Sequence, residues 1–201
     1  MKIASGSESR PFARARWRCG TSLVRNVLAY SRPQAPAGES ANVDEALQRV
    51  LWLRPQLEQR SIAFDIEMPT QRTRVQLGTA RLEQVLTNLI TNARDALPVG
   101  GRIQIRAESA WRSPWSDGLD TGPQVRITVT DNGASVPADV LPRIFELYFT
   151  TKSASGGTRL GLATCYAVVR SVGGTIAVTS APEHGTPFTI LLPQVDGDAE
   201  A

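Results

Sequence analysis

The chain has 201 residues, of which 41% are hydrophobic and 20% charged, and its formal net charge is +3. These values are ordinary for a soluble globular protein with one substantial core and an appendage. The sequence has no apolar run of about 18 residues, which excludes a membrane-spanning helix, and Cys19 and Cys165 indicate neither a zinc site nor a disulfide framework.

The first third of the chain predicts two helical segments joined by a linker. A basic run at residues 10–18 matches no nucleic-acid-binding motif, so we expect no nucleic-acid partner. Residues 17–32 have apolar side chains at helical spacing, and residues 34–42 are rich in Pro, Gly and Ser, as linkers are. The next helix is expected to begin after Asn42 as its N-cap and to be interrupted at Pro55.

The rest of the chain alternates between strand and helix patterns. Apolar and polar residues alternate, which predicts strands, at residues 61–69, 102–108, 124–131, 174–180 and 187–193. Between them we expect helices at 82–97 and 162–172, turns and a short helix within 131–152, and a polar loop at 109–123. Most strands follow one another as hairpins, so the order predicts an α+β fold, a two-layer sandwich with helices covering one face of the sheet.

The helix "LEQVLTNLITNARDAL", residues 82–97, has an unusual polar flank. At 100° per residue its apolar residues fall within a sector of about 140°. Asn88, Asn92 and Asp95 cluster beside that sector, at the border with solvent. They could be only the first polar row of an amphipathic helix, but asparagine is a mediocre helix former. Their oxygens would suit a hydrated Mg²⁺ ion and phosphates.

Two further segments indicate a ligand site less specifically. Asp131 follows a buried strand in "VTDNG", which is a turn signal, yet a buried carboxylate there could accept a hydrogen bond from the amine of adenine. Gly133 would let the backbone approach the base. The small residues of "GGTRLGLAT", residues 156–164, open a helix whose N-terminal amides could face an anion, although no P-loop or dinucleotide motif is present.

Taken together, the segments resemble a known family. "NLITNARDA" is similar to the N box of sensor histidine kinases, "DNGASVP" to the first glycine box and "RIFELYFTTK" to the F box. "GGTRLGLA" is similar to the second glycine box and "HGTPF" to the last. The chain therefore resembles the catalytic ATP-binding domain of these kinases, whose superfamily includes gyrase, the heat-shock-90 chaperones and the mismatch-repair ATPases. The resemblance implies a Bergerat-type fold.

The resemblance also implies roles for individual residues. Asn92 would be the Mg²⁺ ligand with Asn88 beside it, Asp131 would bind the adenine amine, and Lys152 would meet the γ-phosphate. The implied catalytic residues are Asn88, Asn92 and Lys152, and the implied ATP-binding residues are Asn88, Asn92, Asp95, Asp131, Gly133, Lys152, Gly157, Thr158, Arg159, Leu160, Gly161, Leu162 and Thr186. The cofactors would be ATP and Mg²⁺. Residues 157–162 would form a mobile lid over the phosphates.

The sequence departs from the family pattern at several positions. Ser135 and Arg159 stand where the first and second glycine boxes usually have glycine, which favours altered ATP binding. The only histidine, His184, lies in a predicted turn without the acidic neighbour and helical setting of a phosphoacceptor. The chain would therefore transfer phosphate to a histidine that it does not itself contain.

The resemblance further implies an organisation and partners. Residues 1–33 would be a remnant of the second helix of the dimerisation hairpin, 34–42 a linker, 43–196 the ATP-binding domain and 197–201 a tail. A response regulator and a phosphoacceptor-histidine domain would be the partners, with a homodimer possible through the first helix. We expect a cytoplasmic chain, whose full-length parent could be anchored in the inner membrane.

Two alternatives to kinase activity remain open. One is a degenerate or non-catalytic nucleotide-binding module, which Ser135, Arg159 and the absent phosphoacceptor histidine favour. The other is an ATP hydrolase like the gyrase and chaperone relatives, which have a glutamate as general base where this chain has Asn88. Glu83 lies about 140° around the helix from Asn88 and could not replace that base.

Overall fold

The computed structural model describes residues 39–110, 122–147, 149, 160–180 and 185–195. The predicted helix at 17–32, residues 34–38 of the linker, and Cys19 lie outside this part of the chain. None of the helices within it combines the length and hydropathy of a membrane span.

The described elements occur in the predicted order, with two short strands added. They are β1 (Ala41–Asn42), α2 (Val43–Arg49), the 3-10 helix η1 (Val50–Leu53), α3 (Arg54–Glu58), β2 (Ile62–Glu67), β3 (Arg74–Val75), α4 (Thr79–Ala96), β4 (Gly101–Ala110), β5 (Gln124–Asp131), the 3-10 helix η2 (Leu141–Arg143), α5 (Gly161–Ser171), β6 (Thr175–Val178) and β7 (Thr186–Val195). The strands form one sheet in the order β1-β3-β7-β5-β4-β2, and β6 pairs with β7.

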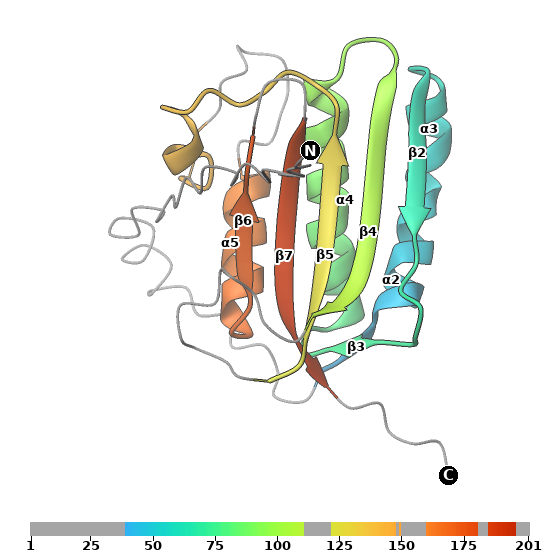
Figure 1. Ribbon diagram of the computed structural model, residues 1–201, viewed down its shortest axis with the longest axis vertical. Helices are drawn as coiled ribbons and strands as arrows, with labels where there is room; N and C mark the ends of the chain where they lie inside the picture. Colours follow the sequence, from blue (N-terminus) through green and yellow to red (C-terminus); the bar gives the residue numbers. More distant parts are fainter. Residues whose placement is uncertain (1–38, 111–121, 148, 150–159, 181–184, 196–201) are drawn as a thin grey trace, which may run out of the picture.

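Helices cover one face of this sheet. In Figure 1, α4 runs behind β5 and β4, α5 lies behind β6, and α2 and α3 lie beside β2. The inner face is apolar because alternate strand residues point toward the helices, as Val125, Ile127 and Val129 of β5 do, all at most 1% exposed. The predicted α+β two-layer sandwich is confirmed.

Two local signals predicted the structure around α2 and α3. The Asn42 side chain accepts a hydrogen bond from the Asp44 N–H at 2.9 Å, which makes it the predicted N-cap of α2. Pro55 lies in the first turn of α3, after the chain has passed through η1, so the helix is interrupted as predicted. The end of the predicted linker is more ordered than expected, because Ala41 and Asn42 pair with Val75 and Arg74.

Two strand predictions differ from the structure. β2 pairs with β4 in parallel, so it is not part of a hairpin. β4 also continues to Ala110, two residues into the segment expected to be a loop, because Ser109 and Ala110 pair with Val125 and Gln124. The partner strand decides the direction of β2 and the end of β4. The local sequence pattern does not reveal which strand that partner is.

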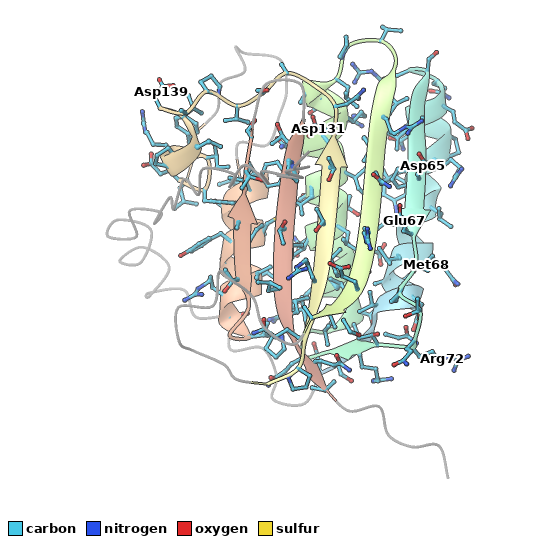
Figure 2. All side chains as sticks on the ribbon, viewed as in Figure 1. Asp65, Glu67, Met68, Arg72, Asp131 and Asp139 are labelled. Atoms are coloured by element: carbon cyan, nitrogen blue, oxygen red, sulfur yellow. The ribbon has the colours of Figure 1, made fainter. Side chains whose placement is uncertain are left out.

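The other face of the sheet carries charged side chains, as a solvated face should. Figure 2 shows Asp65 and Glu67 on β2. Asp65 pairs with Arg102 at 3.7 Å, and Glu67 accepts a hydrogen bond from Gln104 at 2.6 Å. Such exposed pairs contribute little stability each, and this face is clearly distinct from the face that carries Asp131.

Candidate functional site

The polar flank of α4 lies where the helix pattern predicts. The buried residues of α4 are Leu82, Val85, Leu86, Leu89, Ile90 and Ala93, which are the predicted core face. Asn88 and Asn92 beside them are half-buried, and Asp95 is exposed. The row therefore runs along the border between the core and solvent, with two amide groups and one carboxylate on the same side of the helix.

Asn88 is held against the first turn of α5. Its Nδ2 donates to the carbonyl oxygen of Gly161 at 3.5 Å, and a Cβ added to Gly161 would lie 3.8 Å from the Asn88 Cγ. The end of the second glycine box, at Gly161, thus lies beside the N-box row. Asn88 and Gly161 are 73 positions apart, so no local sequence pattern predicts this contact. The resemblance to the kinases indicated it only by assigning both residues to the ATP site.

Cys165 fills the interior between α4 and α5. It is fully buried, and its Sγ lies 3.7 Å from the carbonyl oxygen of Val85. Burial raises the pKa of the Cys165 thiol to about 12, although a hydrogen bond with the Asn88 side chain opposes this rise. The thiol therefore stays protonated and supports the packing beside Asn88.

We expect Cys165 to resist thiol reagents in the folded protein. In a Cys19→Ala variant, Cys165 is the single thiol. At pH 8 its alkylation should be at least about 100-fold slower in native buffer than in urea, because the unfolded thiol has a pKa of about 8.5 and is accessible. Equal rates of alkylation, followed by mass spectrometry, would contradict the described packing.

Asp95 has a positively charged neighbour that the sequence prediction did not include. Its Oδ1 accepts hydrogen bonds from the Arg94 Nε at 3.0 Å and Nη2 at 2.9 Å. The two side chains are 32% and 26% exposed, so solvent screens the pair only in part. Arg94 therefore brings a positive charge to the carboxylate of Asp95 at this end of α4.

Asp131 is a buried carboxylate at the end of β5. It continues the inward-facing row of that strand and is 2% exposed, and Figure 2 shows it at the tip of the strand. Its Oδ1 accepts a hydrogen bond from the Gly133 N–H at 2.9 Å. The carboxylate is thus oriented by the turn that follows it, and a buried carboxylate of this kind could recognise an amine.

Gly133 is required by packing within the protein. A Cβ at this position would lie 2.7 Å from the Ala96 carbonyl oxygen and 2.8 Å from Asp131 Oδ1. The turn after β5 therefore touches the C-terminal end of α4, which places Asp131 near the end of the Asn88, Asn92 and Asp95 row. Gly133 lies close to the backbone of Ala96, which explains why glycine is needed at this position. That Gly133 also lets the backbone approach an adenine base stays a prediction.

Replacing Gly133 with alanine should lower the free energy of unfolding by about 1–3 kcal/mol, because the turn must shift to relieve two close contacts. Gly122→Ala is the matched control, since a Cβ there meets nothing within 4 Å. Urea denaturation of both variants measures the difference. Equal stability of the two variants would contradict the contact between the turn and α4.

Thr186 completes the buried polar end of the sheet. It is 2% exposed and pairs with Asp131 across β5 and β7. The preceding Gly185 has φ +72°, and a Cβ there would overlap the Asp131 carbonyl oxygen, so only glycine fits. The Ser180 Oγ lies 3.1 Å from the Thr186 Oγ1 and accepts a hydrogen bond from the Val136 N–H at 2.8 Å.

The second glycine box is described only in part. Gly161 and Leu162 belong to the first turn of α5, and Leu160 before them is 41% exposed. Lys152, Gly157, Thr158, Arg159 and His184 lie outside the described residues. Their contributions therefore remain predictions from the sequence.

The described side chains suit a ligand that bears both an amine and phosphates. Buried acceptor and hydroxyl groups lie at the end of the sheet, and amide oxygens lie along α4. No cluster of three His, Cys, Asp or Glu side chains is found among the described residues. Mg²⁺ fits this donor set, because it keeps several waters and takes one or two side-chain oxygens together with substrate phosphates.

Comparison with known proteins agrees with this geometry. The family of histidine kinase-, DNA gyrase B- and HSP90-like ATPases matches residues 78–196, which contain α4, the described part of the site and the last strand. The chain belongs to this ATP-binding family, and it corresponds to the catalytic domain of sensor histidine kinases.

Individual relatives show the extent of the match. The sensor kinase CckA of Brucella abortus (strain 2308) is 37% identical over 179 residues, which are 87% of this chain and 19% of CckA. The catalytic domain of the histidine kinase ThkA superposes with a TM-score of 0.62 at 29% identity, covering 77% of this chain and 93% of that domain. ThkA solved in complex with the response regulator TrrA gives a TM-score of 0.63 at 26% identity, over 86% of this chain and 46% of ThkA. The chain thus spans about a fifth of the length of CckA.

Proposed function

We propose that this chain binds Mg-ATP and transfers its γ-phosphate to a histidine on another polypeptide segment. The observation that carries the proposal is the buried carboxylate of Asp131, paired with Thr186 and packed through Gly133 against the end of α4. This arrangement supports an adenine end beside Asp131 and a phosphate end along α4. The roles of Asn88, Asn92, Asp95, Asp131 and Thr186 are part of this proposal.

The protein would contribute positioning and charge neutralisation more than covalent chemistry. Asn92 would hold Mg²⁺, and Asn88 would lie beside it, fixed by Gly161. When bound, the ion would neutralise phosphate charge. Lys152 is the cation proposed to meet the phosphates. The acceptor imidazole would come from outside these 201 residues, whose only histidine is His184.

Asn88 favours transfer to histidine over hydrolysis. A hydrolase needs a general base that activates water, and the amide of Asn88 cannot accept a proton at neutral pH. Glu83 is half-buried on α4 but lies about 140° around the helix from Asn88. We therefore propose a phosphotransferase with slow steady-state ATP hydrolysis.

A response regulator is the proposed downstream partner, because ThkA was solved in complex with one and resembles this chain in fold. The phosphoacceptor-histidine domain would act before it in the relay. Both proposals concern a whole signalling protein. The relatives are about three to five times as long as the part of them that this chain matches.

Phosphotransfer to a separately produced phosphoacceptor-histidine domain tests the proposal. The chain is incubated with that domain, Mg²⁺ and ATP labelled at the γ-phosphate. We expect label on histidine that is lost in acid and kept in base, and no transfer by Asn92→Ala. ATP binding without transfer would favour the non-catalytic module, and rapid phosphate release without an acceptor would favour the hydrolase.

A further inference from the structure

Ser180 connects three parts of the candidate adenine end. Val136 belongs to the loop after β5, Ser180 follows β6, and Thr186 begins β7. The Ser180 Oγ accepts from the Val136 N–H at 2.8 Å and lies 3.1 Å from the Thr186 Oγ1. A single hydroxyl therefore links segments that come together only in the folded chain, beside Asp131.

The direction of one hydrogen bond in this group follows from its donor. The Val136 N–H can only donate, so the Ser180 Oγ accepts there and keeps its own proton. Between Ser180 and Thr186 either hydroxyl can be the donor, and one of the two arrangements has Ser180 donating. Donation from Ser180 to Thr186 extends the chain in one direction, and each hydroxyl that accepts becomes a better donor. Thr186 is then left with its proton available for an acceptor on the ligand.

This direction matters because Thr186 is the neighbour of Asp131 across the sheet, and both are 2% exposed. Asp131 offers an acceptor and Thr186 a donor. The Watson–Crick edge of adenine has the complementary pair, an amine donor at N6 and an acceptor at N1. Hypoxanthine reverses both groups, with an acceptor at O6 and an N–H at N1.

We propose that Ser180 is a positioning residue that sets the selectivity of this site for adenine over hypoxanthine, by holding the Thr186 hydroxyl as a donor. The inference rests on the proposed function, because it assumes that the base lies against Asp131 and Thr186. Ser180 itself need not touch the nucleotide, so its effect is on the ratio of two affinities.

Calorimetric titration of the whole chain with Mg-ADP and Mg-IDP measures this ratio. The parent chain should bind ADP at least about tenfold more tightly than IDP, and Ser180→Ala should lower that preference about tenfold by weakening ADP. Ser180→Thr, which keeps the hydroxyl, should preserve the preference within about threefold. Ser171→Ala is the control, because its Oγ likewise makes one hydrogen bond to the backbone, donating to the Val168 carbonyl oxygen at 2.7 Å, away from the site.

A double variant gives the second arm of the experiment. Thr186→Val removes the hydroxyl that Ser180 is proposed to orient, so adding Ser180→Ala to it should lower the preference no further. A further fall in the double variant, or an unchanged ratio in folded Ser180→Ala, would overturn the inference. If Ser180→Ala does not fold, Ser180→Cys takes its place with the same expected fall.

Failure of the proposed function gives a different result. A parent chain that binds neither nucleotide contradicts both the proposed function and the role of Ser180. A parent chain that binds ADP, with a preference that Ser180 does not influence, contradicts only the inference about Ser180.

Discussion

Replacing Asn92 with alanine should lower the affinity for ATP in the presence of Mg²⁺ at least about 100-fold, since loss of an outer-shell partner alone can cost a metal site that much. Asn92 is half-buried on the flank of α4 that carries Asn88 and Asp95. Its proposed role is to hold the ion. In EDTA the variant and the parent should therefore differ by less than about threefold.

Gln84→Ala is the matched control for Asn92→Ala, because Gln84 is an exposed amide on the same helix. It should bind Mg-ATP as the parent chain does. A loss of affinity in Asn92→Ala that persists in EDTA would show that Asn92 does not act through the ion. Far-ultraviolet circular dichroism of each variant verifies that α4 is intact.

Replacing Asp131 with asparagine should also lower ATP affinity at least about 100-fold, with or without Mg²⁺, because a buried charge-assisted hydrogen bond to the adenine amine is lost and a donor is left unpaired. The carboxylate also accepts from the Gly133 N–H at 2.9 Å, so the substitution disturbs the orienting turn as well. Titration calorimetry with ATP measures the loss.

Asp139→Asn is the control for Asp131→Asn. Asp139 is exposed in the segment that follows the turn, and Figure 2 shows it far from Asp131. Its substitution should leave ATP affinity within about twofold of the parent. Comparable affinities for the two variants would place the base somewhere other than beside Asp131.

The helix α4 and its polar flank were predictable from the sequence because their signals are local. Apolar residues at a 3.6-residue period defined the buried face, and Asn88 and Asn92 followed from their positions beside it. The N-cap at Asn42 and the interruption at Pro55 depend on single residues with strong backbone preferences.

Features that depend on distant partners were not predictable in the same way. The two-residue strands β1 and β3 are too short for an alternating pattern, and only their pairing with each other and of β3 with β7 reveals them. Ser180 resembles an ordinary turn residue in the sequence, and its contacts with Val136 and Thr186 exist only after β5, β6 and β7 come together.

The central claim, that this chain is an ATP-binding domain with its base beside Asp131 and its phosphates along α4, has one most direct test. The whole chain is titrated calorimetrically with a non-hydrolysable ATP analogue and Mg²⁺. We predict one nucleotide per chain with a Kd between about 1 μM and 1 mM, the usual range for substrates. Absence of measurable binding by the folded chain would contradict the claim.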